Sequence, residues 1–208
     1  MKITRHVHAC VEIEHEGFRI VIDPGGFGAP HDLVTAQAVL ITHRHPDHID
    51  TPALLKAVKK NPDLQVYAPV AVAEELPVDI RVVAHGDTFE LGGLKIEVLG
   101  AKHAINVRVL PVEENVGYLI DGRILHPGDA FHPRADLELV LLPVNGPWVK
   151  MLDIEEWLVA FPPKRFIGIH DGIVNSHGLG INEKILNLLA TKVGAEYLPL
   201  RPGESLDT

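Results

Sequence analysis

Runs of apolar residues separated by polar turns predict a chain built largely from short strands. Residues 11–14 and 18–22 alternate apolar and polar side chains on either side of His15-Glu16-Gly17, a pattern typical of a β-hairpin. The continuous apolar run at 38–41 predicts a buried strand. The remaining strands are predicted at 65–68, 81–84, 88–91, 94–99, 116–120, 123–126, 138–142, 166–169 and 197–200.

Capping signals predict helices between these strands. Thr51-Pro52 combines an N-cap residue with proline at the first helical position, which predicts a helix from there to about Lys60. Asp153-Ile154-Glu155-Glu156 resembles a capping box and predicts a helix that begins at Asp153 and ends near Phe161. A short helix at 69–76 and a last helix at 181–192 complete the predicted elements.

The segment from Thr42 to His48 holds three imidazoles and a carboxylate directly after the predicted strand at 38–41. Side chains alternate in an extended chain, so His43 and His45 project to the same side and can hold one metal ion. Pro46 bends the path, which lets Asp47 and His48 point toward a second ion. A histidine-rich surface loop is the alternative interpretation. The position at a strand end and the candidate ligands further along the chain favour a metal site.

Three more candidate ligands follow predicted strands. His103 comes after the strand at 94–99, Asp129 after the strand at 123–126, and His170 after the strand at 166–169. Strand ends are rigid, and the loops that leave them can gather at one edge of a sandwich. Taken singly, each of these residues could also be an exposed loop or turn residue. Their order after the first cluster is what favours a shared site.

The order of these motifs resembles the metallo-β-lactamase superfamily over nearly the whole chain. His8-Ala9-Cys10, Ile22-Asp23-Pro24 and Asn145-Gly146 are most similar to its single-domain, lactonase-like hydrolase branch. The resemblance implies an α/β fold, a four-layer αββα sandwich. By motif it also implies one metal ion held by His43, His45 and His103, another held by Asp47, His48 and His170, and Asp129 bridging both.

The chain departs from the family pattern at two places. Ala130 follows Asp129 where many members carry threonine, which puts a hydrogen bond to the bridging carboxylate in doubt. His177 lies close enough to His170 in sequence to compete for the last ligand position. His31, His126 and His132 are further candidates for the pocket wall, Asp23 either supports the ligands or caps a turn, and Trp148 is expected to pack.

The predicted activity is metal-dependent hydrolysis. Two ions can share a hydroxide that attacks a carbonyl or phosphoryl centre. Asp47 would ligate and orient it, and His8 could protonate the leaving group. Zinc is the expected metal, with manganese or iron as alternatives. A small lactone or phosphoester is the favoured substrate. A di-iron redox enzyme and a non-catalytic metal-binding scaffold are the competing functions.

Length, charge and cysteine content limit the kinds of binding partner and the compartment expected for this chain. The chain has 208 residues and is predicted to form a single domain over 1–208. Its formal charge of −9 argues against nucleic acid or an anionic membrane as the main partner, and leaves a small molecule. Cys10 is the one cysteine in the sequence, so an intrachain disulfide cannot form. A cytoplasmic location is expected, and the oligomeric state stays open.

Overall fold

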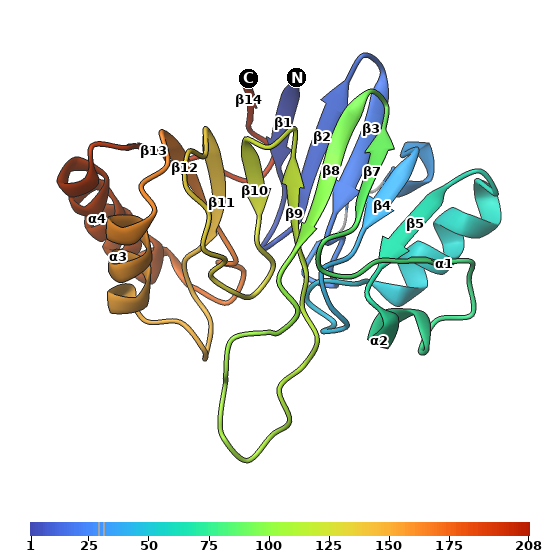
Figure 1. The fold of residues 1–208 in the computed structure, drawn as a ribbon, viewed down its shortest axis with the longest axis horizontal. Helices are drawn as coiled ribbons and strands as arrows, with labels where there is room; N and C mark the ends of the chain where they lie inside the picture. The colour runs from blue at the N-terminus through green and yellow to red at the C-terminus, as the bar shows by residue number, and fades with distance from the viewer. Residues whose placement is uncertain (29, 31) are drawn as a thin grey trace.

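Two β-sheets pack face to face, with helices on both outer sides, in this computed structural model, which describes residues 1–28, 30 and 32–208 (Figure 1). Within those residues each sheet has seven strands. The first sheet runs in the order β14 (Ser205–Asp207), β1 (Lys2–Arg5), β2 (Val11–His15), β3 (Phe18–Ile22), β4 (Ala38–Leu40), β5 (Gln65–Ala68) and β6 (Arg81–Val82). The second runs in the order β13 (Glu196–Leu198), β12 (Arg165–Ile169), β11 (Leu139–Pro143), β10 (Ile124–His126), β9 (Gly117–Ile120), β8 (Leu94–Leu99) and β7 (Thr88–Leu91).

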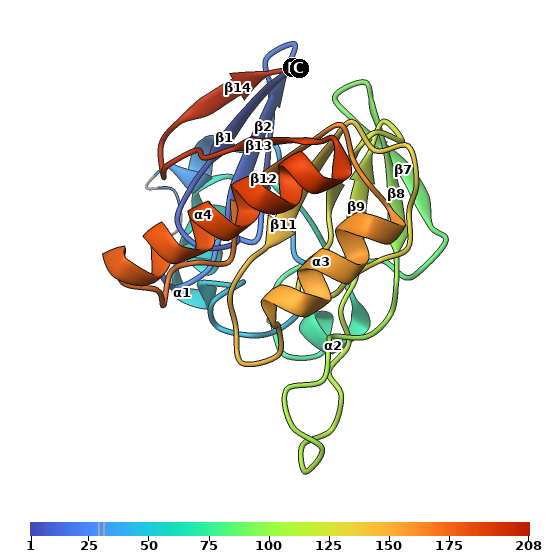
Figure 2. The ribbon, with the colours of Figure 1, turned by 90° about the vertical axis from the view of Figure 1, so that its left-hand side faces the viewer.

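Three apolar clusters hold the layers together. The central cluster lies between the sheets, where Ile13 and Ile20 of the first sheet are fully buried along with Ile96 and Leu141 of the second. A second cluster packs α3 (Met151–Ala160) and α4 (Ser176–Val193) on the outer face of the second sheet. A third packs α1 (Thr51–Lys60) and α2 (Val70–Ala73) on the first sheet. This is the predicted four-layer αββα sandwich, with the helices outermost (Figures 1 and 2).

Two helices begin earlier than the sequence indicates. α3 begins at Met151, and Asp153 is its third residue, whose carboxylate accepts a hydrogen bond from the Lys150 amide at 2.8 Å. The predicted capping residue is therefore inside the helix. α4 begins at Ser176 because the Asn175 side chain caps it, accepting from the Gly178 amide at 3.0 Å. Glycines in the first turns of α4 have low helix propensity and hide this start.

The carboxyl ends of several strands meet at one edge of the sandwich. β3, β4 and β5 run parallel in the first sheet, as do β10, β11 and β12 in the second. The loops that leave these ends carry the polar residues singled out by the sequence, at the lower edge in Figure 1. Gly25 permits the close packing there, because a Cβ at this position would lie 1.7 Å from the carbonyl oxygen of Asp47.

A half-buried carboxylate on β2, that of Glu12, makes the fold sensitive to acid. Burial acts to raise the pKa of Glu12, but hydrogen bonds with His6 and Arg19 outweigh it and lower this pKa to about 2. A folded-state pKa below the unfolded value of about 4.3 adds stability at neutral pH, which is lost as pH falls through that window. We expect Glu12→Gln to lower the free energy of unfolding of the metal-free protein by about 2 kcal/mol at pH 7.

Urea titrations at pH 7 and at pH 3 test this expectation. The deficit of Glu12→Gln should shrink at the lower pH, because Glu12 is then mostly protonated in the unfolded chain, which removes much of the stability that its ionised form gives the wild type. Glu14, exposed on the same strand, gives a matched control, and Glu14→Gln should change stability by less than about 0.5 kcal/mol. An equal deficit at both pH values would contradict the role of Glu12.

Candidate metal centre

Imidazole and carboxylate groups from separate loops meet at the edge where the strands end. The structure brings them together in two groups, in each of which the candidate ligand atoms lie within 4.8 Å of one another. The first group is His43, His45, His103 and Asp129. The second is His8, Asp47, His48 and His170. All seven residues predicted as ligands are therefore adjacent, although they come from four loops along the chain.

Hydrogen bonds fix the orientation of four imidazoles. The Thr42 hydroxyl donates to Asp23 at 2.7 Å, so its oxygen is left to accept from His43 Nδ1 at 2.9 Å. His48 Nδ1 donates to Asp23 at 2.7 Å. His103 and His170 donate their Nδ1 protons to the carbonyl oxygens of Ala104 and Asn145, respectively. When these rings are neutral, the Nε2 atom of each carries a lone pair that faces the centre. Hydrogen bonds at the other ring nitrogen fix the tautomer and orientation of metal-binding histidines in this way.

His45 presents its other nitrogen. Its Nδ1 atom lies 3.0 Å from His43 Nε2, and the two rings meet edge to face with centroids 4.7 Å apart. Bends at Thr42 and Arg44 interrupt the extended path that the sequence predicted, yet the two imidazoles still lie together. The pair can approach a single ion from two directions.

Asp129 lies at the centre of the ligand groups. Its Oδ1 atom is 3.1 Å from His48 Nε2, and its Oδ2 atom is 3.2 Å from His103 Nε2 and 3.0 Å from His170 Nε2. Among the described residues, however, Asp129 Oδ1, His48 Nε2 and His170 Nε2 are buried and have no partner in hydrogen-bonding geometry. Buried polar atoms are rarely left this way. A cation shared between them would satisfy these atoms, so the donor set fits divalent metal ions.

Trp148 supplies a hydrogen bond that the sequence put in doubt. Its indole Nε1 donates to Asp129 Oδ2 at 2.9 Å, so Ala130 in place of threonine does not leave the carboxylate unsupported. The sequence favoured packing over binding for Trp148. The Asn115 side chain accepts from the Asp129 amide at 2.9 Å and holds the same loop from the other side. The indole of Trp148, in the loop after β11, thus donates the hydrogen bond that a threonine hydroxyl at position 130 would otherwise be expected to supply.

Burial and neighbouring charges favour the neutral form of the imidazoles of His43 and His45 and the ionised form of the carboxylate of Asp129. Burial, with the nearby charge of His48, holds the pKa of His43 well below its usual value. Burial and the nearby His103 also lower the pKa of His45. Burial opposes ionisation of Asp129, but His48 and His170 outweigh it and keep its pKa well below the usual value. Neutral imidazoles and ionised carboxylates are the states that bind metal ions.

His8 belongs to the second group but differs from the other histidines. Its Nδ1 atom accepts a hydrogen bond from the Gly172 amide at 2.9 Å, so the proton resides on Nε2. Nε2 then donates to Asp47 Oδ2 at 3.0 Å. Burial acts to raise the pKa of Asp47, yet His8, His48 and His170 bring it down to about 2. His8 therefore fixes the position of the Asp47 carboxylate. The lone pair on His8 Nδ1 is occupied by the Gly172 amide and is not free to bind a metal ion.

The loop after β12 carries His170 in a left-handed backbone conformation, with φ of 63°. Its amide donates to the His8 carbonyl at 2.9 Å. The buried Arg5 side chain donates to Gly168 and Asp171 on either side of His170. His177 is exposed on α4 and belongs to neither group, so the geometry favours His170 as the last ligand.

The other sequence candidates have structural partners or lie apart. His126 and His132 are buried, and their Nε2 atoms bond to the carbonyl oxygens of Ala9 and Pro127. Both support the loops beneath the centre. Asp23 does more than cap a turn, since its carboxylate holds His48 and Thr42. His31 lies outside the described residues.

Comparison with known proteins identifies the family. Residues 2–170 match the β-lactamase superfamily domain, and the chain belongs to that superfamily. A protein of Mycobacterium tuberculosis is 35% identical over 87% of this chain and 89% of its own length. A UPF0173 metal-dependent hydrolase of Bacillus pumilus is 37% identical over 82% of this chain and 85% of its own.

A solved structure confirms the fold class. The metallo-β-lactamase fold protein YhfI of Bacillus subtilis superimposes with a TM-score of 0.75 at 14% identity, covering 99% of this chain and 98% of its own. The match to the family over residues 2–170 confirms the superfamily prediction, while the lactonase-like branch stays a prediction. None of the described helices is both long and apolar enough to span a bilayer.

Proposed function

We propose that this chain uses two divalent metal ions, zinc foremost, to hydrolyse a small ester-type substrate such as a lactone or a phosphoester. Metal-dependent hydrolase is the class to which its relatives are assigned, and this chain is an enzyme of that class. The observation that carries the dinuclear proposal is the set of inward-facing ligand atoms around Asp129, three of which are buried without a hydrogen-bond partner among the described residues.

The residues around the centre would have distinct roles in binding the ions and positioning the reacting groups. Bound divalent ions would lower the pKa of water and polarise an acyl or phosphoryl oxygen. His43, His45 and His103 would hold one ion and Asp47, His48 and His170 the other, with Asp129 between them. Asp47 is 25% exposed, whereas His48 and Asp129 are buried, so Asp47 faces the side from which substrate and water arrive. His8 fixes its carboxylate.

The decisive experiment combines metal analysis with hydrolysis assays on Asp47→Ala. We expect the variant to lose about one metal ion per chain and to lower kcat/KM for lactone or phosphodiester reporters by about 100-fold or more, roughly 3 kcal/mol of transition-state stabilisation. Asp63 is an exposed carboxylate outside both ligand groups, so Asp63→Ala is the matched control and should behave as wild type. Wild-type metal content and activity in Asp47→Ala would rule the proposal out.

A further inference from the structure

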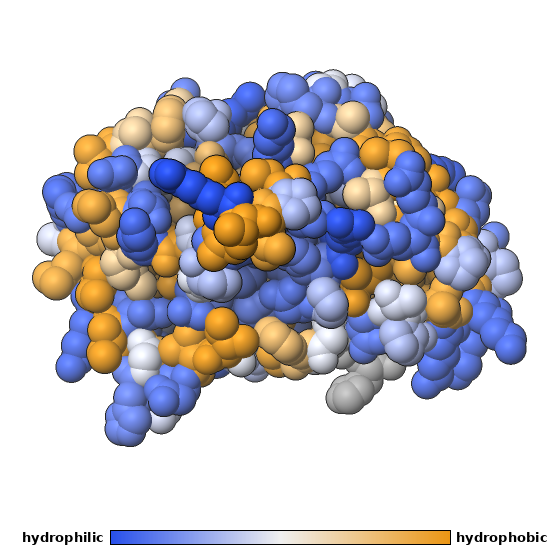
Figure 3. Space-filling view, turned by 90° about the horizontal axis from the view of Figure 1, so that it is seen from below, coloured by the Kyte–Doolittle hydropathy of each residue, from blue (hydrophilic) through white to orange (hydrophobic). Residues whose placement is uncertain are grey.

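The segment 104–112, which we call the projecting loop, extends beyond the sandwich at the edge that carries the metal centre (Figures 1 and 2). Its tip is unusually apolar for an exposed segment. The aliphatic side chains with large exposure are Ile105 at 61%, Val107 at 50%, Val109 at 90%, Leu110 at 59% and Val112 at 44%. Seen from below, apolar side chains gather on this face (Figure 3). Contiguous exposed apolar surface of this kind marks a binding site.

The base of the projecting loop is fastened to the ligands. Lys102 and Glu114 form an isolated antiparallel bridge, and the His103 amide donates to the Glu113 carbonyl at 3.0 Å. The Ala104 amide donates to the Asp129 carbonyl at 2.8 Å. Arg44, between His43 and His45, donates to both carboxylate oxygens of Glu113, at 2.7 and 2.9 Å. The loop therefore begins and ends on the metal centre itself.

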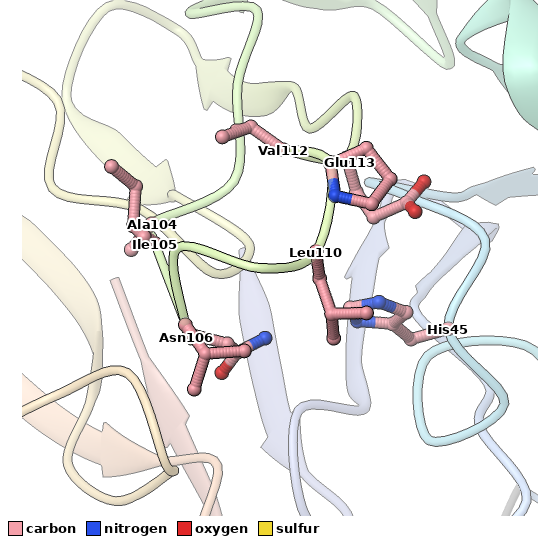
Figure 4. A pocket seen from close by; sticks show the side chains of 9 residues that line it. His45, Ala104, Ile105, Asn106, Leu110, Val112 and Glu113 are labelled. Carbon is pink, nitrogen blue, oxygen red and sulfur yellow. The ribbon is translucent and has the colours of Figure 1, made fainter.

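A cavity of about 250 Å³ lies between the projecting loop and His45 (Figure 4). Its walls include Ile105, Val107, Leu110 and Val112. Since one water takes up about 30 Å³ in the liquid, the cavity has room for roughly eight water molecules. An unbranched group of about four to six carbon atoms, each about the size of a water, fits within that space. His45 forms part of the wall, so an occupant would be adjacent to the reacting centre.

The charges around the cavity disfavour an anionic occupant. No lysine or arginine is among its lining residues in the described chain. Glu113 lines it, and its carboxylate accepts hydrogen bonds from Arg44 at 2.7 and 2.9 Å, so that charge is already paired. Asn106 and His45 are the other polar side chains at the wall. Arg108 belongs to the projecting loop but does not line the cavity. A phosphate-bearing arm would find no unpaired cation on the cavity wall, whereas an aliphatic arm would find matching side chains.

We propose that this cavity binds the aliphatic arm of the substrate, and that the substrate is a carboxylic ester or lactone with an unbranched chain of about four to six carbons beside the scissile bond. This inference rests on the proposed function. The cavity's continuity with His45 distinguishes a substrate arm from the other occupants of an apolar surface, a second copy of the chain or a lipid, neither of which needs a recess beside a ligand.

Binding of straight-chain carboxylates, which mimic the acid product, tests the proposal without turnover. Acetate, butyrate, hexanoate and decanoate are titrated into the zinc-loaded protein by calorimetry. Burial of one methylene is worth about 0.8 kcal/mol, so affinity should rise about fourfold per methylene until the cavity is filled, and level off beyond about six carbons. Hydrolysis of the matching p-nitrophenyl esters should follow the same order in kcat/KM.

Two variants of the projecting loop separate the cavity from the exposed tip. Leu110→Ser changes a lining residue, whereas Val109→Ser changes the neighbouring aliphatic residue, which is 90% exposed and does not line the cavity. Leu110→Ser should reduce the preference for hexanoate over acetate by about tenfold and leave acetate affinity within about twofold. Val109→Ser should keep the wild-type preference.

Each outcome decides the matter. Equal affinity for acetate and hexanoate, or a chain-length preference that Leu110→Ser leaves intact, overturns the proposal while metal-dependent hydrolysis stands. So does a dimer, or binding to phosphatidylcholine vesicles, that Leu110→Ser and Val109→Ser weaken alike with no change in chain-length preference. If the metal-loaded protein neither binds acetate nor hydrolyses any ester, the proposed function itself fails.

Discussion

Asp129→Ala is expected to reduce hydrolysis by about 1,000-fold or more, equivalent to about 4 kcal/mol in kcat/KM. The physical reason is that this one carboxylate faces His48, His103 and His170 at 3.0 to 3.2 Å. In the proposed two-ion arrangement, both ions would lose a ligand and the negative charge between them. Metal analysis after dialysis should find fewer than two ions per chain in the variant.

The same variant should unfold more easily when metal-free. Asp129 and Asp23 outweigh burial and raise the pKa of His48 well above its usual value, so His48 is charged in the metal-free protein. Removing one partner of a buried pair costs about 3–5 kcal/mol when the remaining charge is left uncompensated, and we expect about 3 kcal/mol here, because Asp23 still pairs with His48. Thermal unfolding of the metal-free variant measures this cost, with Asp63→Ala as control. A variant that keeps two ions and full stability would refute the central role of Asp129.

Much of the fold follows from local patterns. Strands at 18–22, 65–68, 88–91 and 94–99 occur where alternation and turn residues predicted them. α1 spans 51–60 as predicted, but Asp50 caps it in place of Thr51, by accepting a hydrogen bond from the Ala53 amide at 2.9 Å. Pairing of the chain ends did not follow from the sequence. β1 pairs with β14 across nearly the whole chain, from Lys2 to Asp207, and β14 has only three residues. Such short edge strands form because a neighbour is present, which no local pattern reports.

The site was predictable to the extent that its residues sit in short motifs. The segment 42–48 holds four of the candidate ligands within a few residues, and the structure places all four in the two ligand groups. Trp148 contacts Asp129 only because β10 and β11 lie side by side, so its role could not be seen in sequence. The projecting loop was not foreseen either. Its aliphatic residues match those of a buried strand, and exposure is decided by what packs nearby.

Asp23→Asn is expected to weaken metal binding by about 10- to 100-fold while the protein stays folded. The Asp23 carboxylate accepts three hydrogen bonds, from the Thr42 amide at 2.8 Å, the Thr42 hydroxyl at 2.7 Å and His48 Nδ1 at 2.7 Å. Asparagine keeps the shape and tolerates the left-handed backbone here, where φ is 50°. However, it replaces one acceptor oxygen by a donating NH₂ group.

That replacement should move the proton of neutral His48 from Nδ1 to Nε2. Facing a donor, neutral His48 would accept at Nδ1 and carry its proton on Nε2, the atom that faces Asp129. Zinc calorimetry measures the loss of affinity, and imidazole ¹⁵N shifts of the metal-free protein at pH 9 report the tautomer. Asp32→Asn, on an exposed carboxylate that pairs with Arg19, is the control and should leave both unchanged. If Asp23→Asn carried the proton on His48 Nε2 and still bound zinc as tightly as wild type, the hydrogen bond from His48 to Asp23 would not control metal affinity.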